Sequence, residues 1–597
     1  MKQRPISIGG LLSLLGLLAA AAVPFLTDNP YYMQKFQMAG ILIVAVQGLN
    51  IMAGYAGQIS LGHAGLFAVG AYTAAKLALD LNWGFLGGFA GAVLMTALVG
   101  LLLGVPALRV RHHYLAIVTI GFGIVVEKLA NEGGSFTGGF AGLSGIPGVR
   151  LFGQELGDVG TYYLILALVA VLTWGLSNLT HSRVGRAFMA LREGEVAAES
   201  LGISEYRYKL AAFLLGSLGA GMAGAFYAHV FNYVSPESFT FNVSVEMLVM
   251  LLLGGMGTVV GPILGVGLIQ VLPELIAGLD AYRLIVYGGL LLATVILFPG
   301  GLAGLLSRVW RERRELLPSE TELKRLEEKA VDLLRRDHGS SDTPALLVQG
   351  LTKRFGGVTA LEGIDMEVRT GTIHALIGPN GSGKTTCLHT ISGIYKPSGG
   401  SIALHGVDLT HRKAYERARL GLARTFQRSQ VFPRLTVLEN VLVGQHSWRR
   451  TGLLQGALAL PSARREEKQA REFALGLLSL TGLADRAYQE AGSLPHGLQR
   501  VLEIARALAA RPSLLLLDEP AAGLTETEVE ALDRLLQRIK GLGITILLIE
   551  HDMRLVMGIS DAVTVLDSGS VICSGSPDVV QRDPQVLAAY LGETAAD

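Results

Sequence analysis

The sequence predicts a two-part fold, in which an all-α polytopic membrane domain of eight to ten spans precedes an α/β P-loop domain. Hydrophobic residues make up 50% of the chain and charged residues 17%, yet apolar runs of spanning length stop near Leu306. A glycine-rich loop pattern then appears in a region with the charge density of a water-soluble protein. We expect a membrane domain at 1–307, a charged helical linker at 308–343 and the α/β domain at 344–597.

The membrane domain is indicated by runs of roughly 20 apolar residues, the length that crosses a bilayer as a helix. We expect spans near residues 6–26, 37–55, 60–80, 85–105, 114–130, 160–178, 210–231, 243–257, 262–278 and 283–303. The first follows Lys2 and Arg4 and is interpreted as a retained helix, because many spans come after it.

Basic residues mark cytoplasmic loops, and they gather at Arg109 and Arg111, within 183–209 and within 308–314. Ten spans with both ends inside satisfy this pattern. They place the α/β domain in the cytosol and the loop 131–160 outside.

Charge and cysteine content exclude two other classes. The net charge of +1 gives no indication of nucleic-acid binding. Both cysteines, Cys387 and Cys573, lie in the α/β part, so no disulfide framework is expected and a reducing cytosol suits this part.

Polar residues at the mouth of one expected span are Gln58, Ser60 and His63, which stand among glycines. Polar groups inside a membrane are expensive and tend to be functional, which makes this trio a candidate translocation path. The alternative is that they form hydrogen bonds between helices.

The loop 182–203 has small apolar residues at helical spacing, among them Val196, Ala197, Ser200 and Leu201, with charges opposite. This pattern favours a short helix that docks in a groove of a soluble partner, with a solvated surface helix as the alternative. The candidate coupling residues are Arg192, Glu193, Ala197, Ala198, Leu201 and Gly202.

The linker changes abruptly to charged residues. Ser319 to Glu322 form a capping-box pattern, and Leu323, Leu326, Ala330 and Leu333 follow at helical spacing. We expect an amphipathic helix here, followed by a flexible joint at 338–344.

A phosphate-binding loop runs from Gly378 to Thr385, between an apolar strand at 373–377 and a helix at 385–392. Backbone N–H groups of such a loop surround phosphates, Lys384 reaches the terminal phosphates, and the Thr385 hydroxyl suits Mg²⁺. The expected ATP contacts are Gly378, Pro379, Asn380, Gly381, Ser382, Gly383, Lys384, Thr385 and Thr386.

Two further apolar strands end in polar residues. The strand 514–517 leads into Asp518 and Glu519, and the strand 544–549 leads into Glu550 and His551. Asp518 is placed to hold the Mg²⁺ shell and Glu519 to polarise an attacking water, since phosphoryl transfer depends on positioning and charge neutralisation. His551 is expected at the γ-phosphate.

The membrane part resembles the permease family for branched-chain amino acids of bacterial ABC importers. The segments that carry the likeness are GQISLGHAGLFAVGAY, HYLAIVTIGFG, SRVGRAFMALRE and GGMGTVVGPILG, which occur in order within residues 30–305.

The α/β part, over residues 345–594, is similar to the ATPase subunit of the same family, with an α/β core and a helical subdomain. The segments are LTKRFGGVTALEGI, LARTFQ, LEIARAL, DEPAAGL, LIEHDM and AAYLGE. The resemblance implies that Gln427 senses Mg²⁺ and the permease, that Phe355 stacks on adenine, and that Glu519, His551 and Gln427 serve catalysis. Thr385, Gln427 and Asp518 are then the Mg²⁺ residues.

One segment departs from the family pattern LSGGQ, namely Leu494, Pro495, His496, Gly497, Leu498 and Gln499. Pro495 has no hydroxyl for the γ-phosphate, and Leu498 stands where glutamine is expected. ABC ATPases form sandwiches in which a signature acts at the opposite subunit's ATP. The weak signature is therefore expected to serve the partner's site, not the ATP at Lys384.

These features predict an ATPase subunit fused to a permease in the cytoplasmic (inner) membrane, with ATP and Mg²⁺ as cofactors and a branched-chain amino acid as the imported substrate. The resemblance implies a second permease, a second ATPase and an extracytoplasmic solute-binding protein as partners. Urea or amide import, an exporter half-molecule and a membrane-anchored ABC ATPase without transport activity are the alternatives.

Overall fold

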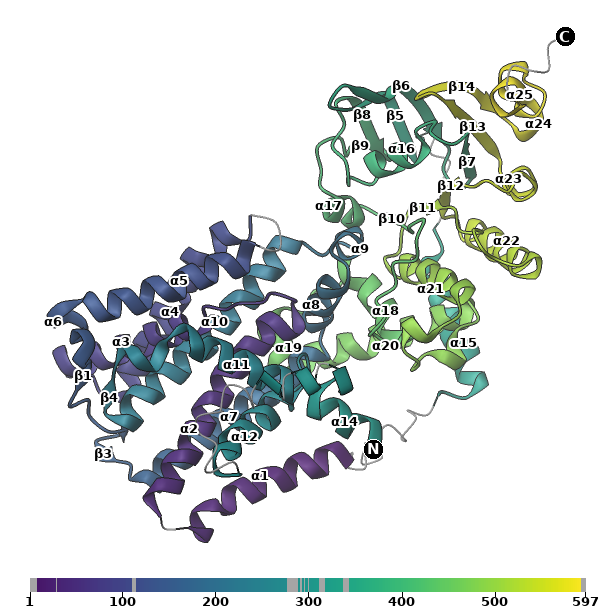
Figure 1. Cartoon of the computed structure of the whole chain (residues 1–597). Helices are drawn as coiled ribbons and strands as arrows, with labels where there is room; N and C mark the ends of the chain where they lie inside the picture. Colours follow the sequence, from purple (N-terminus) through teal and green to yellow (C-terminus); the bar gives the residue numbers. More distant parts are fainter. Residues whose placement is uncertain are drawn as a thin grey trace. The chain divides into compact units, whose positions relative to one another are not determined.

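The computed structural model describes residues 8–27, 29–109, 114–275, 288, 289, 292–294, 296–298, 300–310, 317–336 and 343–591. The expected features at residues 2, 4, 111, 311–314 and 338–342, and residues 283–287, 290, 291, 295 and 299 of the tenth expected span, lie outside these residues. The chain divides into two units (Figure 1). Unit 1 comprises residues 1–181 and 206–313, and unit 2 comprises residues 182–205 and 314–597.

Unit 1 is built from apolar helices. Its elements are α1 (Ile8–Leu26), α2 (Pro30–Leu49), η1 (Asn50–Tyr55), α3 (His63–Asp80), α4 (Phe85–Ala107), α5 (Tyr114–Glu132), α6 (Gly134–Thr137), η2 (Gly139–Ala141), β1 (Leu143–Ser144), β2 (Arg150–Leu151), β3 (Gln154–Glu155), α7 (Asp158–Thr180), α10 (Glu205–Phe231), β4 (Tyr233–Val234), η3 (Pro236–Phe239), α11 (Phe241–Gly254), α12 (Gly261–Leu275) and α14 (Gly301–Trp310). Among the described residues, five helices are long and apolar enough to cross a bilayer, and three shorter apolar helices accompany them. The first nine expected spans coincide with α1, α2 with η1, α3, α4, α5, α7, α10, α11 and α12.

Glycine lets the central helices of unit 1 approach closely. A Cβ added to Gly48 of α2 would stand 2.7 Å from the carbonyl oxygen of Gly216, and one added to Gly219 would stand 2.8 Å from the Cα of Gly48. The same holds for Gly70 of α3, whose Cβ would stand 2.7 Å from the carbonyl oxygen of Gly221. Small residues at helix crossings supply close packing where lipid gives no hydrophobic drive.

Two helices of unit 1 are interrupted. α2 continues into the π-helix η1, and residues 56–62 then have no regular secondary structure before α3 begins. α11 ends at Gly254, and Gly255 has a φ of 117°. Asn50 joins the two breaks, because its Nδ2 donates to the carbonyl oxygen of Thr258 at 2.8 Å and its Oδ1 accepts from the Gly257 N–H at 2.8 Å.

Unit 2 contains sheets and a helical layer. Its elements are α8 (Arg183–Glu193), α9 (Glu195–Ser200), α15 (Glu320–Leu334), β5 (Leu346–Phe355), β6 (Val358–Val368), β7 (Ile373–Ile377), α16 (Lys384–Ile391), β8 (Gly399–Leu404), β9 (Val407–Asp408), α17 (Ala414–Arg419), β10 (Leu422–Arg424), α18 (Val437–Gly444), η5 (Gln445–Ser447), α19 (Leu453–Ala457), α20 (Pro461–Leu480), η6 (Ala484–Arg486), η7 (Ala491–Ser493), α21 (His496–Ala509), β11 (Leu514–Asp518), α22 (Glu526–Gly541), β12 (Thr545–Ile549), α23 (Met553–Ile559), β13 (Ala562–Asp567), β14 (Ser570–Gly575), α24 (Pro577–Val580) and α25 (Pro584–Leu591).

The described strands of unit 2 form two sheets. One has the order β10-β11-β12-β7-β13-β14, with parallel pairing from β10 to β13 and an antiparallel β14 at its edge. β7, β11 and β12 are buried at every position, which is why they are continuous apolar runs in the sequence. The other sheet is antiparallel, with the order β6-β5-β8-β9 (Figure 1).

The linker helix α15 begins as expected. The Ser319 hydroxyl accepts a hydrogen bond from the Glu322 N–H. Leu326 and Ala330 are buried and pack with α20 into the core of the helical layer. The third buried position is Leu334 and not the expected Leu333, which is 50% exposed. The buried face of α15 continues at a spacing of four residues, which leads from Ala330 to Leu334.

Candidate functional site

The phosphate-binding loop lies between β7 and α16, as the sequence predicts. Gly378, Gly381 and Gly383 have φ values of 148°, 86° and 99°, which residues with a Cβ rarely adopt. Lys384 is the first residue of α16, and its Nζ donates to the carbonyl oxygens of Gly378 and Pro379 at 2.7 and 2.8 Å. The loop therefore presents backbone N–H groups at a helix N-terminus, with the lysine held beside them.

The carboxylate of Asp518 ends the buried strand β11. Its Oδ2 accepts from Arg424 at 3.0 Å, and both side chains are 1% exposed. Its Oδ1 is buried and has no hydrogen-bond partner among the described residues. An unpaired buried carboxylate oxygen is expensive unless it meets a cation, so Asp518 fits a ligand of the Mg²⁺ shell. Burial raises the pKa of Asp518, against the effect of Arg424.

Glu519 is held by two of the predicted residues. Gln427 Nε2 donates to Glu519 Oε2 at 2.9 Å, and His551 Nε2 lies 2.7 Å from Glu519 Oε1. β11 and β12 are parallel neighbours, so the residues after them meet at one edge of the sheet. Glu519 has a φ of 47°, a strained backbone for a residue with a side chain, and such strain gathers at functional sites.

Phe355 ends β5 and is 42% exposed. Its ring meets Tyr395 edge-on, with centroids 5.1 Å apart, and Lys353 Nζ lies 4.8 Å from its centroid. An exposed aromatic ring with a positive charge nearby suits stacking on a nucleotide base.

The signature segment leads into α21, with Pro495 as its N-cap residue. A Cβ on Gly497 would stand 2.6 Å from Glu528 Oε1. Leu498 packs against the core of the helical layer. Gln499 Nε2 donates to the carbonyl oxygen of Leu494 at 2.9 Å, and His496 Nδ1 would lie 3.9 Å from a Cβ on Gly523.

An ionic network on α21 was not predicted. Glu503 is 1% exposed, lies within 4 Å of Arg500 and Arg506, and accepts from the Gln430 N–H at 2.6 Å. Arg500 donates to the carbonyl oxygens of Phe426 and Gln427. The network ties the signature helix to the loop that carries Gln427. The only sequence signal was the charge spacing of three residues on one helix face.

The segment 182–205 docks on the body of unit 2. The Arg434 N–H donates to Glu193 Oε2 at 3.2 Å, and Arg419 donates to the carbonyl oxygen of Gly202 at 3.3 Å. Ala197, Ala198 and Leu201 are buried, whereas Val196, expected on the same face, is 46% exposed. α9 is a separate helix of six residues that begins after Gly194. Its direction leaves the Val196 side chain outside the buried face of the segment.

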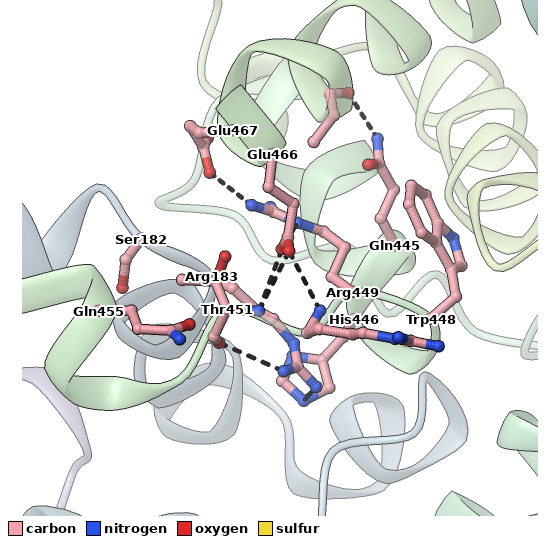
Figure 2. A network of polar contacts seen from close by, with 12 residues as sticks. Ser182, Arg183, Gln445, His446, Trp448, Arg449, Thr451, Gln455, Glu466 and Glu467 are labelled. Carbon is pink, nitrogen blue, oxygen red and sulfur yellow. Dashed lines mark hydrogen bonds and ion pairs between the residues drawn. The ribbon is translucent and has the colours of Figure 1, made fainter. Parts of the chain in front are cut away.

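The predicted residues of this segment lie at its C-terminal side, and the sequence reasoning missed a second contact at its N-terminal side. Figure 2 shows Arg183 beside His446 and Thr451. Arg186 donates to Glu467 at 2.7 Å. The available signal was a pair of arginines one helical turn apart, which were interpreted only as markers of a cytoplasmic loop.

The polar trio of unit 1 lies at the break before α3. Gln58, Ser60 and His63 are at most 3% exposed. His63 Nε2 lies 2.9 Å from the carbonyl oxygen of Ala45. Both amide atoms of Gln58 and the Ser60 hydroxyl have no hydrogen-bond partner among the described residues. Only His63 therefore fits the alternative role of a hydrogen-bonding residue between helices.

Three family models match the chain. They are "Branched-chain amino acid transport system / permease component" over residues 32–295, "ABC transporter" over residues 361–522 and "Branched-chain amino acid ATP-binding cassette transporter" over residues 570–596.

Curated relatives match the two parts separately. The high-affinity branched-chain amino acid transport ATP-binding protein LivG of Escherichia coli K12 is 45% identical over 251 residues, which are 42% of this chain and 98% of LivG. BraF of Pseudomonas aeruginosa, with the same description, is 43% identical over 251 residues, 42% of this chain and 98% of BraF. The permease protein LivM of Escherichia coli K12 is 38% identical over 310 residues, 48% of this chain and 73% of LivM.

Proposed function

Because the chain belongs to the branched-chain amino acid family of ABC transporters, with a permease and an ATP-binding subunit joined in one polypeptide, we propose that it powers import of branched-chain amino acids. The observation that carries the proposal is Glu519, held between Gln427 and His551 at the end of β11. The chain that contains the permease therefore also contains the side chains that position the attacking water.

The phosphates of ATP bind the backbone N–H groups of the loop 378–385 and Lys384, and the adenine stacks on Phe355. Asp518, Gln427 and the Thr385 hydroxyl would hold Mg²⁺, which would neutralise charge on the phosphates. Glu519 orients the attacking water, and His551 contacts the γ-phosphate. Gln427 donates to Glu519, and its carbonyl oxygen accepts from Arg500 of α21. Gln427 therefore connects the hydrolytic site to the signature helix.

The working transporter requires a second permease and a second ATPase, because ABC sites form between two subunits. We propose that these are separate subunits and that an extracytoplasmic binding protein delivers the substrate. The permease lies in the cytoplasmic membrane with unit 2 in the cytosol. The ATP at Lys384 then meets the partner's signature, whereas Leu494 to Gln499 face the partner's ATP.

The break before α3 is the proposed substrate path. Interrupted helices in transporters direct their N-terminal ends at anionic substrate groups, and the N-terminus of α3 begins at His63. The amide of Gln58 and the hydroxyl of Ser60 offer a donor and acceptors that suit an α-carboxylate and an α-ammonium group. Gln58→Leu should raise the substrate concentration for half-maximal uptake, and an unchanged value contradicts this assignment.

The central experiment is uptake by proteoliposomes that contain the full-length chain, its partner subunits and the binding protein. ATP-dependent uptake of labelled leucine, with no uptake of labelled urea, supports the proposal. Glu519→Gln should lower ATP turnover of the complex by about a hundredfold or more, since it removes the charge that positions the water. Unchanged turnover, or uptake without ATP, refutes the proposed function.

A further inference from the structure

A cluster of buried charges fixes the first turn of α8 to the ATPase body. Arg186 is 5% exposed, and its guanidinium donates to Glu467 Oε2 at 2.7 Å. Arg449, which is 1% exposed, donates to the same oxygen at 2.8 Å and to Glu466 Oε1 at 3.0 Å. Figure 2 shows Arg449 lying between the two glutamates of α20. We call Arg186, Arg449, Glu466 and Glu467 the docking clamp.

The clamp has a fixed charge pattern. Burial acts to raise the pKa of Glu467, but Arg186 and Arg449 outweigh it and hold the pKa below its usual value. Glu467 is therefore ionised at neutral pH, and it accepts from both Arg186 and Arg449. The ATPase body contributes two carboxylates and one guanidinium, and the loop supplies the second guanidinium.

A second contact lies beside the clamp. Arg183 donates to His446 Nε2 at 3.2 Å, which requires the neutral imidazole with its proton on Nδ1. Burial and the neighbouring arginines hold the pKa of His446 well below its usual value, so this form persists at neutral pH. Ser182 caps α8, and a Cβ on Gly456 of α19 would stand 2.9 Å from the Ser182 Cβ.

Buried charges of this kind contribute more to selectivity than to affinity. A docking partner without a carboxylate at the place of Glu467 would remove the ion pair that the buried Arg186 makes there, and breaking a buried ion pair is strongly unfavourable. Apolar residues such as Phe188 and Leu191, both buried on α8, would accept many apolar partners. The charges are the part of this surface that a different ATPase body does not match by chance.

From the clamp we infer a specificity determinant for subunit pairing: Arg186 and Glu467 make the loop 182–205 select the ATPase domain of its own chain. The inference rests on the proposed function in one respect, namely that the working transporter contains a second ATPase to which the same loop has access. The selection ensures that ATP at Lys384 drives the permease to which its ATPase is fused.

The test is a disulfide reporter in the full-length chain. Cys387 and Cys573 are replaced by serine, and Ser182→Cys with Gly456→Cys are introduced. The built Cβ separation is 2.9 Å, so a small shift reaches the Cβ separation of roughly 3.5–4.5 Å that a disulfide needs. Oxidation in membranes should give an intrachain disulfide, seen as a mobility change without added mass.

Arg186→Gln and Glu467→Gln should each slow this oxidation by about tenfold. The oxidation rate of the double variant should be no more than about threefold below that of either single variant, because both substitutions remove the same contact. Arg465→Glu is the control: it lies two residues from Glu467 on α20 and its side chain is exposed. It should leave the rate unchanged. Retained basal ATP turnover in Arg186→Gln shows that unit 2 is still folded.

Selection against the second ATPase is measured by co-expression of the full-length chain with Ser182→Cys alone and the separate partner ATPase with a cysteine at the position that aligns with Gly456. The inference predicts little interchain disulfide between them. A predominant interchain product overturns it, as does a wild-type oxidation rate in Arg186→Gln, or losses that simply multiply in the double variant. None of these readouts depends on which substrate is carried, so the proposed function can fail without affecting them.

Discussion

Replacing Gly476 with alanine tests whether the linker helix α15 is a packed part of unit 2. Gly476 lies in the interior of α20. An added Cβ would stand 2.8 Å from the Ala330 Cβ and closer still to the carbonyl oxygen of Leu326. The second contact is with backbone, so a change of side-chain rotamer does not relieve it. α15 has to move as a whole.

Two effects of the substitution oppose each other. Alanine in place of glycine in a helix interior stabilises the helix by about 1 kcal/mol, whereas overpacking of a close contact typically costs about 1–3 kcal/mol. A moved α15 also loses burial at Leu326 and Leu334, which are 7% and 2% exposed and whose full burial contributes roughly 1.5–3 kcal/mol each. We therefore expect α15 docking to weaken by about 1–2 kcal/mol, or about fivefold to thirtyfold.

Hydrogen exchange of the α15 amides in the full-length chain measures this free energy directly. The docked helix exchanges through local opening, so a weaker docking free energy appears as faster exchange by the same factor. In the docked state Glu327 accepts from the Ser479 hydroxyl at 2.6 Å and pairs with Arg538 at 2.7 Å, which ties α15 to two other helices.

The matched control is Gly558→Ala, in α23, where an added Cβ meets nothing within 4 Å. This variant should leave exchange in α15 unchanged and stabilise α23 by up to about 1 kcal/mol. Exchange in α15 that is unchanged or slower in Gly476→Ala would refute the reasoning, because helix propensity would then outweigh the contact.

Three other predictions concern the ATPase unit. Asp518→Asn leaves Arg424 buried beside a neutral partner, so we expect about 3–5 kcal/mol of destabilisation in thermal unfolding, together with loss of Mg²⁺-dependent turnover. His446 has a pKa well below its usual 6.5 because of burial and nearby arginines, so its contribution to stability is present above pH 6.5 and is lost as pH falls below it. Between pH 7.5 and 5.5 this amounts to at most about 1.4 kcal/mol, and His446→Gln should remove that part of the pH dependence. Gly497→Ala pushes on Glu528 and disturbs the signature that faces the partner's ATP, so ATP affinity at the partner's site should fall by about tenfold or more while ATP affinity at Lys384 changes by less than about twofold; equal losses would contradict a signature that acts at the partner's site.

The sequence was most informative where function depends on consecutive residues. The loop from Gly378 to Thr385 was identifiable because its glycines, lysine and flanking strand and helix are local, and the structure adds the φ values that require glycine and the hydrogen bonds of Lys384. The closeness of Glu519 and His551 was predictable in outline, since parallel strands bring their ends to one edge, whereas Gln427 was assigned only through the family resemblance. The capping box at Ser319 was likewise local.

Long-range pairing was not predictable from the sequence. Arg186 and Glu467 are 281 positions apart, and the charge of Arg186 was fully explained by its cytoplasmic loop. Glu503 was hidden for a related reason: on an amphipathic helix a charged residue is expected at the surface, whereas two arginines allow this one to be buried. In both cases the partner decides the burial, and one sequence does not reveal the partner.

The unusual signature has a local physical explanation. Leu498 packs against the core of the helical layer, so this position exchanges a polar amide for apolar contact within its own unit. Gly497 remains, and a Cβ at this position would have to push the Glu528 side chain aside. The segment therefore keeps the shape of a signature loop while it loses polar groups that would face the partner's ATP. Since Asp518, Glu519 and His551 are all present in the same unit, we propose that the two ATP sites of the assembled transporter are unequal, with the one at Lys384 the main hydrolytic site.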